Sequence, residues 1–577
     1  MSAGSASRTE TRTRLRFSST RRFLAAFISL AAALSIIGCS TEVEPRPTYV
    51  AFQSRGGDSF EQTERVWGHS DCDSIAITVN GSLVDASIRR SGKRFQARIP
   101  LQQGPNAVVA RCEGARDTSA SDSLSFDLKL TDPPAADEVG GARDRPTWLK
   151  RAVVYAPVAE LWGNDGAVAV RRNLPYLKRL GANVLWLWPP ASSRAPGEEY
   201  AITDYFRVDE SWGSKKALQV LIAEAHAQEM RVIVDFVPNH MSRRSPYFRD
   251  AATYGRSSAY WDFFDRDARG RPMHYFDWVH LPNLNFDNPE VRNMLIEAST
   301  YWMEEMGVDG FRMDVAWGVR RRHPGFWTQL SQAIKAINPD AMLLAEDSAR
   351  APYYRDNGFD VAYDWTNELG EWAWAKAFAT PTRTGALLRR AIARVAGRDG
   401  LVLRFINNND TGRRFVDRYG PELTMAAATL QFTVPGVPAM FAGDEIGASF
   451  EPYTEIGRIP WRDRYGLRPF YKKLIEIRRK IPALTSHRID LLHTNDPGTL
   501  AFIRPSATGS PVLVVLNFGQ ATEVHLSGRG LRALPAEMID LLTDAEVRLD
   551  RERHSASIPL DGRSALVLSS RERHLGP

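Results

Sequence analysis

The stretch GFRMD, residues Gly310–Asp314, ends a short apolar run with an acid, and the stretch LAE, residues Leu344–Glu346, repeats that arrangement in the next apolar run. Short apolar runs that alternate with amphipathic helical stretches predict the strands of a parallel sheet. Each acid then stands at the carboxyl end of a strand, on neighbouring strands. The two stretches therefore indicate an α/β fold with acids gathered at one edge of its sheet.

Strand candidates of this kind continue on both sides of the pair, eight in all. They are Val153–Pro157, Val184–Pro189, Val232–Val237, Val308–Met313, Met342–Glu346, Phe359–Tyr363, Leu403–Ile406 and Val437–Phe441. Helical stretches separate them, and the one that begins at Val291 has the apolar spacing of an amphipathic helix. Eight such units in about 300 residues predict a (β/α)8 TIM barrel over residues 148–482, because a doubly wound sheet rarely needs eight strands.

Other segments interrupt or flank this barrel pattern. Residues 241–280, after the third strand, are rich in aromatic residues and Arg and predict a short inserted subdomain. Residues 40–132 have an all-β pattern with a strong hairpin turn at Asn80–Gly81, and they predict an immunoglobulin-like β-sandwich. A linker over residues 133–147 follows, and residues 483–577 predict a C-terminal β-sandwich.

The first residues of the chain have the pattern of an export signal. Residues 1–38 carry six Arg and one Glu, and the apolar run Phe23–Ile37 is too short for an ordinary membrane span. The run ends in IIGC, Ile36–Cys39, which resembles a bacterial lipobox, so Cys39 is expected to carry a lipid that anchors the protein to a membrane. Cleavage without lipidation is the alternative. In both cases the protein is expected to be exported to the cell envelope, lipid-anchored or periplasmic.

The charge of the chain excludes one class of partner. The 577 residues have a formal net charge of +6, and most of it lies in residues 1–38. The folded part therefore has no basic stripe, and no nucleic-acid partner is expected.

Besides Cys39 the chain has two cysteines, and both lie in the predicted N-terminal sandwich. An exported compartment permits disulfides, so a bridge between Cys72 and Cys112 is favoured over two buried thiols. The sequence has no CxxC pair and no Cys/His cluster of the kind that binds a metal.

The strand ends carry most of the candidate chemistry, because the active site of such a barrel lies at the carboxyl ends of its strands. The third strand delivers Asp235, Asn239 and His240, the fourth Arg312 and Asp314, the fifth Glu346 and the seventh Asp410. Acids on three separate strands, beside one Arg, form the pattern of a retaining glycosidase, which needs a nucleophile and a proton donor.

The residue types fit the steps of double displacement. Asp314 is placed to attack the anomeric carbon, and Arg312 beside it favours its ionised form. Glu346 must arrive protonated, and neighbouring acids raise the pKa of such a group. Asp410 can bind sugar hydroxyls and stabilise the oxocarbenium-like transition state, and His240 can donate to a sugar hydroxyl. Retention requires the carboxyl groups of Asp314 and Glu346 to lie about 5–5.5 Å apart.

Six segments in order resemble motifs of the α-amylase family of glycoside hydrolases, family 13. They are Asp235–His240 (DxxxNH), Leu281–Asn285 (LPDLN), Gly310–Asp314 (GFRxD), Glu346, Phe405–Asp410 (FxxNHD), and Pro435–Pro438 with Gly443–Gly447. Tyr200, with Asp204–Tyr205, matches the loop whose Tyr stacks on the sugar at the cleavage point. The resemblance covers about residues 148–570.

The resemblance implies a role for each acid and a class of substrate. Asp314 is the implied nucleophile, Glu346 the implied acid/base and Asp410 the implied stabiliser of the transition state. The implied reaction is hydrolysis of α-1,4-glucosidic bonds in starch-like or maltooligosaccharide substrates.

Two departures from the family pattern leave the exact substrate open. Asn409 stands where the family usually has His, so it can donate a hydrogen bond to a sugar but carries no imidazolium charge. Trp317 and Gly318 stand where the amylases of the family often have Lys-His, so an indole replaces a charge on the acceptor side. The expected substrate-binding residues are Tyr200, His240, Arg312, Asn409 and Trp317.

The sequence also leaves open whether calcium binds and which activity of the family the protein has. Asn239 resembles the calcium ligand of the family, but the inserted segment that usually supplies the other oxygens is short, and Asn239 can equally bond the backbone of its loop. The chemistry itself requires no cofactor. An α-glucanotransferase or isomerase shares the path to the glycosyl-enzyme, and it differs in what resolves that intermediate. A non-catalytic glycan-binding relative would usually have lost one of the three acids.

Several aromatic and basic runs have simpler interpretations. Trp186 and Trp188 are expected to pack in the barrel rather than to bind sugar. The runs Arg171–Arg172 and Arg320–Arg322 are expected to be solvated helix faces. The run Tyr260–Phe264 fits a glucan-stacking surface and a small core equally well.

Overall fold

The computed structural model describes residues 50–570 with several gaps. The residues left out between these limits are 53–56, 60–62, 71, 85–87, 92–93, 114–120, 129–144, 194–199, 351, 366–373, 375–376, 395–400, 454–456, 508 and 553. The predicted signal peptide over residues 1–38 and the lipidation site Cys39 lie outside the described residues. Among the helices that the structure describes, none combines the length and the apolar character needed to cross a bilayer.

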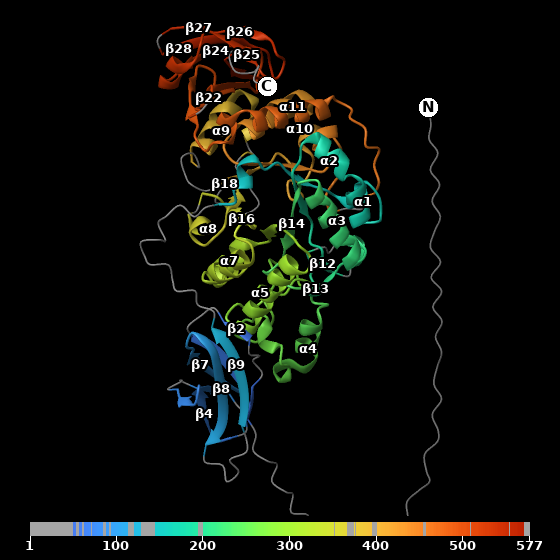
Figure 1. Ribbon diagram of the computed structural model, residues 1–577, viewed down its shortest axis with the longest axis vertical. Coiled ribbons are helices and arrows are strands. Elements are labelled where there is room, and N and C mark those ends of the chain that lie inside the picture. The colour runs from blue at the N-terminus through green and yellow to red at the C-terminus, as the bar shows by residue number, and fades with distance from the viewer. Residues whose placement is uncertain are drawn as a thin grey trace, which may run out of the picture. The chain divides into compact units, whose positions relative to one another are not determined.

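Eight parallel strands close into a barrel, in which β10 pairs with β11 on one side and with β19 on the other. Strands β14, β16 and β18 of this barrel are labelled in Figure 1. The eight strands are β10 (Val154–Ala156), β11 (Val184–Leu187), β14 (Arg231–Phe236), β15 (Gly310–Met313), β16 (Met342–Ser348), β17 (Val361–Tyr363), β18 (Leu401–Arg404) and β19 (Val437–Phe441). Nearly all of their residues are buried, because helices cover the outside and side chains fill the inside. The predicted (β/α)8 barrel is therefore confirmed, with a strand at each of the eight predicted runs.

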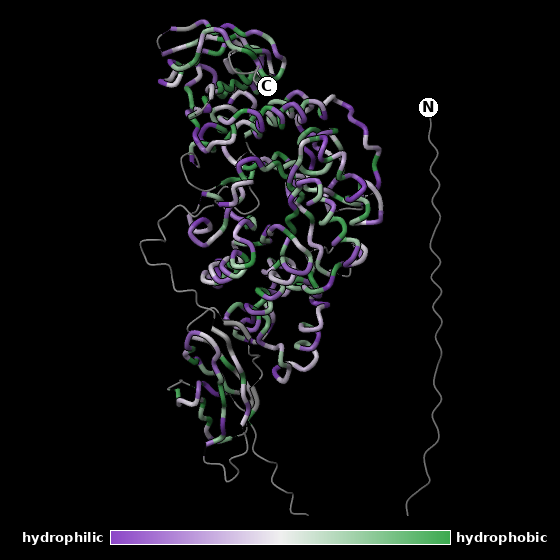
Figure 2. The backbone as a smooth tube through the Cα atoms, viewed as in Figure 1, coloured by the Kyte–Doolittle hydropathy of each residue, from purple (hydrophilic) through white to green (hydrophobic). Residues whose placement is uncertain are grey.

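Amphipathic helices surround these strands. The main ones are α1 (Ala167–Arg172), α2 (Leu174–Leu180), α3 (Lys215–Ala227), α5 (Pro289–Glu304), α6 (Ala316–Arg322), α7 (Phe326–Ile337), α8 (Tyr353–Asp356), α9 (Thr384–Ala393), α10 (Phe415–Thr433) and α11 (Leu467–Lys480). In Figure 2 they alternate between hydrophilic and hydrophobic residues along their length. Helix α5 begins at Pro289 rather than Val291, because the Asn288 side chain caps it by accepting from the Glu290 N–H.

The segment between β14 and α5 forms the insertion after the third strand. It contains the helix α4 (Pro246–Tyr254), the short 3-10 helices η4 (Gly255–Ser257) and η5 (Trp261–Phe263), and irregular chain with isolated β-bridges. Phe263 and Phe264 are buried in it, and the rings of Tyr260 and Phe263 lie 5.1 Å apart. Phe263 and Phe264 belong to the main hydrophobic core of the barrel, and Tyr260 packs against that core.

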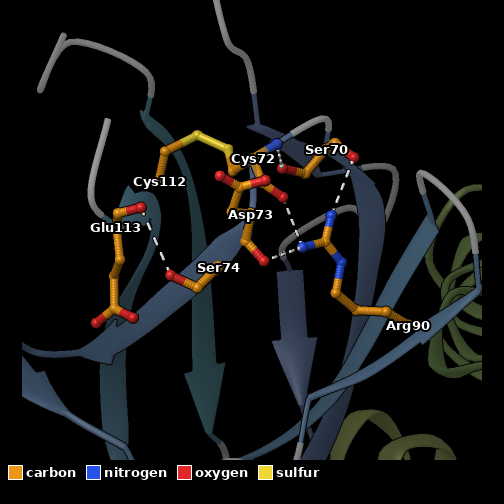
Figure 3. Close-up of a disulfide and its surroundings, with 7 residues drawn as sticks. All are labelled: Ser70, Cys72, Asp73, Ser74, Arg90, Cys112 and Glu113. Atoms are coloured by element: carbon orange, nitrogen blue, oxygen red, sulfur yellow. Dashed lines mark hydrogen bonds between the residues drawn. A yellow bond between two sulfur atoms is a disulfide. The ribbon is translucent and has the colours of Figure 1, made fainter. Parts of the chain in front are cut away.

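Two sheets make up the N-terminal region, as predicted. One has the order β1-β3-β7-β6 and the other β2-β9-β8-β4-β5. The strands are β1 (Val50–Phe52), β2 (Gly57–Ser59), β3 (Thr63–Ser70), β4 (Ser74–Val79), β5 (Ser82–Leu83), β6 (Arg89–Ser91), β7 (Arg94–Pro100), β8 (Gly104–Glu113) and β9 (Ser121–Leu128). A disulfide joins Cys72 to Cys112, with the two Cα atoms 5.5 Å apart, and Arg90 donates to the Cys72 carbonyl nearby (Figure 3).

The C-terminal region also consists of two antiparallel sheets, with the orders β20-β22-β23-β29-β25-β26 and β21-β24-β28-β27. The strands are β20 (Asp490–Leu491), β21 (His493–Thr494), β22 (Thr499–Arg504), β23 (Val512–Asn517), β24 (Thr522–Ser527), β25 (Glu537–Asp540), β26 (Glu546–Arg548), β27 (Asp550–Arg551), β28 (Ser555–Leu560) and β29 (Ser564–Ser569). Phe502 and Val514 share one core with Leu388 of α9 and Leu430 of α10, so this region packs on the barrel helices.

Candidate active site

The register of the barrel strands brings the predicted acids together. Asp235 on β14 is opposite Arg312 on β15, and Met313 is opposite Ala345 on β16. The residues that follow the last pair, Asp314 and Glu346, therefore leave neighbouring strand ends side by side. This is the carboxyl end of the barrel, where the active site was predicted.

The guanidinium of Arg312 lies at the centre of the site, with 1% of its side chain exposed. Its Nη1 donates to Asp235 Oδ1 at 3.0 Å and to Asp314 Oδ1 at 2.8 Å. Its Nη2 lies 3.0 Å from Glu346 Oε2 and 4.0 Å from Asp410 Oδ2. One positive charge faces four carboxyl groups, and their mutual repulsion favours the protonated form of at least one of them.

Burial and mutual repulsion decide which carboxyl holds that proton. Burial raises the pKa of Glu346 well above its usual range; Arg312 opposes this rise, and the charges of Asp314 and Asp410 add to it. Burial also raises the pKa of Asp314, against the opposing effect of Arg312. Asp314 Oδ1 lies 2.8 Å from Arg312 Nη1, and Glu346 Oε2 lies 3.0 Å from Arg312 Nη2. Because Asp314 makes the shorter contact with the guanidinium, we assign the negative charge to Asp314 and the proton to Glu346. One buried pair of acids is thereby divided into a proton donor and an anion.

The residue after Asp314 has an unusual backbone conformation. Val315 has φ 47°, in the left-handed region that β-branched residues rarely adopt, and its N–H donates to Glu346 Oε2 at 2.6 Å. This contact fixes the acid beside the nucleophile. Strained backbone at a site is a signal that sequence patterns do not carry.

Tyr200, Asn409 and Tyr453 form a hydrogen-bonded chain along one side of the acids. The Tyr200 hydroxyl donates to Asp235 Oδ2 at 2.7 Å, and Asn409 Nδ2 donates to the Tyr200 and Tyr453 hydroxyls. Tyr453 in turn donates to Asp410 Oδ1 at 3.1 Å. The amide at position 409 thus orients the side chains around Asp410. Tyr453 was missed by the sequence analysis, because it lies in a loop after β19 without a motif of its own.

His240 is buried next to Tyr200 and contacts its backbone. Its ring is 1% exposed, and burial lowers its pKa to about 3, so it is neutral. Asn239 Nδ2 donates to Nδ1 at 3.1 Å, which leaves the proton on Nε2, and Nε2 lies 3.1 Å from the Tyr200 carbonyl. Both ring nitrogens are therefore engaged with protein groups near Tyr200.

A group of aromatic rings, Tyr275, Phe276, Trp278 and Trp317, lies beside the acids; we call it the aromatic platform. The Tyr275 ring stacks on His240 at 5.1 Å. Burial raises the pKa of Tyr275, and the nearby carboxyl groups of Glu346, Asp314 and Asp410 add to that rise. The rings of Phe276 and Trp317 lie 6.1 Å apart, and those of Phe276 and Trp278 6.0 Å apart. Phe276 and Trp278 are 52% and 51% exposed, so their rings are open to a ligand.

The candidate metal ligand Asn239 is bonded by an arginine. Its backbone and side-chain oxygens both accept from Nη2 of Arg322. With Arg322 bonded to both of these oxygens, the site around Asn239 does not fit a calcium ion. The expectation that Arg320–Arg322 is a solvated face is wrong for Arg320 and Arg322: Arg320 pairs with Asp347 at 2.9 Å, and Arg322 is bonded on all three of its nitrogens. The last turn of α6 points both side chains back toward acids of the barrel and the insertion.

The comparisons with known proteins agree with this geometry. Residues 164–464 match the family model of the alpha-amylase catalytic domain. The chain is 30% identical to the alpha-amylase MalA of Haloarcula japonica in an alignment of 463 residues that covers 76% of this chain and 66% of that protein. It is 28% identical to a cyclomaltodextrinase of Thermoanaerobacter pseudethanolicus over 64% of this chain and 66% of that protein. The chain thus spans just under two thirds of the length of these two relatives.

A solved structure shows the same similarity in three dimensions. The alpha-amylase of Geobacillus thermoleovorans, determined in complex with acarbose, superposes with a TM-score of 0.61 at 25% identity. The match covers 74% of this chain and 99% of that structure.

Proposed function

The chain belongs to the α-amylase family of glycoside hydrolases, and from this we propose that it hydrolyses α-1,4-glucosidic bonds in starch-like or maltooligosaccharide substrates by double displacement. One observation carries the proposal: a single buried guanidinium contacts both Asp314, at 2.8 Å, and Glu346, at 3.0 Å. A nucleophile and an acid on adjacent strand ends are the two groups that retaining hydrolysis needs.

In the first displacement, an Asp314 carboxylate oxygen attacks the anomeric carbon, and the Glu346 proton passes to the glycosidic oxygen as the C–O bond breaks. The products are a glycosyl ester of Asp314 and the shortened sugar with a free hydroxyl. Asp410 lies at the open side of the site, with 39% of its side chain exposed, where its charge can stabilise the oxocarbenium-like transition state.

In the second displacement, the Glu346 carboxylate takes a proton from water, and the water oxygen attacks the anomeric carbon. The ester bond to Asp314 breaks, and the free acid and the nucleophile return to their starting states. Two inversions at one carbon release the α-anomer. Arg312 keeps its contacts with both carboxyl groups and disperses the charge that moves between them.

Product analysis tests the proposal. The protein without residues 1–38 is incubated with maltoheptaose, and the products are followed by chromatography and by NMR of the anomeric protons. We expect shorter sugars that are first released as α-anomers. Early β-anomers would contradict double displacement. Absence of turnover with measurable glycan binding would instead support the non-catalytic alternative.

The aromatic platform supports transglycosylation as a second activity, because exposed rings beside the acid can hold a sugar acceptor in place of water. We expect Trp278→Ala to lower the ratio of elongated to hydrolysed products by roughly 2- to 10-fold, the worth of an aromatic contact of about 0.5–1.5 kcal/mol. The ratio is measured at high maltotriose concentration. Tyr254→Ala is the matched control, because Tyr254 is 63% exposed and ends α4 in the same insertion. An unchanged ratio in Trp278→Ala would contradict a role of the aromatic platform in binding the sugar acceptor.

We also propose that the protein is exported to the cell envelope and lipidated at Cys39. The Arg-rich start, the apolar run Phe23–Ile37 and the lipobox-like Ile36–Cys39 support this. Mass spectrometry of the mature N-terminus in the native host is expected to find a diacylglyceryl Cys39. A mature N-terminus without lipid would be consistent with export but would contradict the proposed lipid anchor.

A further inference from the structure

The Arg322 guanidinium is enclosed by oxygens, and these form what we call the oxygen cage. The cage consists of the backbone oxygens of Asn239, Leu284 and Gly318 and the side-chain oxygens Asn239 Oδ1 and Asp265 Oδ2. Nε donates to Gly318 at 3.3 Å, Nη1 to Asp265 at 2.7 Å and to Leu284, and Nη2 to both oxygens of Asn239. A guanidinium has five N–H groups, and each cage oxygen receives one of these contacts.

The composition of the cage is that of a site for a hard cation. Carbonyl, amide and carboxylate oxygens converging from separate segments are the ligands that calcium takes in proteins. A second cation is excluded, because the guanidinium already occupies the centre and would repel it. The Phe286 ring covers one face of the guanidinium at 5.1 Å. Asp265 is the one carboxylate of the cage, and its single charge is matched by Arg322.

We propose that Arg322 serves as a built-in cation that holds the insertion to the barrel in place of a divalent metal ion. The cage oxygens come from the loop after β14, from the insertion and from α6. A planar fork of fixed donors suits such a role better than a point charge, because it bonds several oxygens in set directions. The protein is therefore expected to be stable without a metal ion, because the oxygens that could bind one are already bonded to Arg322.

The neighbouring residues connect the cage to the active site. Asn239 also bonds the His240 ring, which supports Tyr200, and Gly318 follows Trp317 of the aromatic platform. A Cβ atom at position 318 would lie 2.6 Å from Asn239 Oδ1, so Gly318 is what allows α6 to approach the cage. Loss of the guanidinium is therefore expected to loosen the platform and the Tyr200 side of the site together.

Thermal unfolding of the protein without residues 1–38 tests the proposal, with and without excess EDTA and with millimolar Ca²⁺. The wild type is expected to keep one Tm in all three conditions. The Tm of Arg322→Ala is expected to be lower by about 5 °C or more, because the change leaves the partly buried Asp265 carboxylate and several carbonyl oxygens unpaired. Millimolar Ca²⁺ is expected to restore part of that loss, since the emptied cage presents oxygen ligands.

Two further variants keep the test decisive. Arg269→Ala is the matched control, an exposed Arg of the same insertion whose loss should leave Tm unchanged in all conditions. Arg322→Lys keeps the charge without the fork and is expected to fall between wild type and Arg322→Ala. A wild-type Tm that falls in EDTA and recovers with Ca²⁺ would overturn the proposal. An Arg322→Ala protein with wild-type Tm, or without any response to Ca²⁺, would overturn it as well. Because unfolding is measured, these outcomes do not depend on the proposed hydrolysis.

Discussion

Replacing Asp314 with Ala is expected to lower kcat on maltoheptaose by on the order of 10⁴–10⁶-fold, the range seen when a covalent nucleophile is removed. No other acid can take its place, because Glu346 and Asp235 are each held by Arg312 in other positions. The Tm of Asp314→Ala should change little, because the change removes only a small side chain. It also removes one negative charge from a group of carboxyl groups that repel one another. Glu304→Gln, an exposed acid in α5, is the matched control and should retain full activity.

The stereochemistry of rescue identifies the role of Asp314 directly. With α-maltosyl fluoride as substrate, azide can occupy the space left by the Asp314→Ala change and attack the anomeric carbon. A single displacement then gives the β-glycosyl azide, which NMR distinguishes from the α-anomer. An α-azide would mean that another group still forms the covalent intermediate, and Asp314 would lose the role of nucleophile.

Replacing Glu346 with Gln is expected to lower kcat/KM on maltoheptaose by roughly 10²–10⁴-fold, because the leaving sugar hydroxyl no longer receives a proton. Gln keeps the shape of the side chain and can still accept from the Val315 N–H. Hydrolysis of α-maltosyl fluoride should fall much less in its first step, since fluoride leaves without protonation. Equal losses on both substrates would contradict the role of general acid. Azide should rescue this variant to the α-azide.

The pH profile follows from the same pair. Activity needs Asp314 ionised and Glu346 protonated. Activity should therefore fall on the acid side, as Asp314 takes up a proton at a pH above the usual aspartate range. It should fall again on the alkaline side, as Glu346 loses its proton well above the usual glutamate range. Because Asp314 and Glu346 interact, the two apparent pKa values of the profile describe the pair of acids together. On α-maltosyl fluoride the alkaline limb should be absent from the first step of both the wild type and Glu346→Gln, because fluoride leaves without a proton.

The barrel and its acids could be predicted because both depend on local patterns. Apolar runs mark buried strands, and an acid directly after such a run must lie at the strand end. Neighbouring strands then place Asp314 and Glu346 side by side without further information. Trp186 and Trp188, expected to pack, are 2% and 7% exposed.

The parts that could not be predicted depend on how irregular segments fold. The oxygen cage joins Arg322 to the loop after β14 and to the insertion, and no periodic pattern links those segments. A run of three Arg at a helix end has the same sequence pattern whether it meets water or buried oxygens. Phe276 belongs to a loop as well, and its backbone, with φ 48°, follows no pattern of helix or strand.

Closure of the barrel by β10 and β19 has a consequence for synthesis. Residues Val154 and Ala439 are paired although nearly the whole catalytic region separates them along the chain. Contacts between such distant residues form late in folding, after a large loss of chain entropy. While the ribosome is still adding residues to the chain, the sheet has an open edge and exposed apolar faces that need protection from aggregation. A chain interrupted after Asp410 would contain every acid of the site and still lack the strand that closes the ring around them.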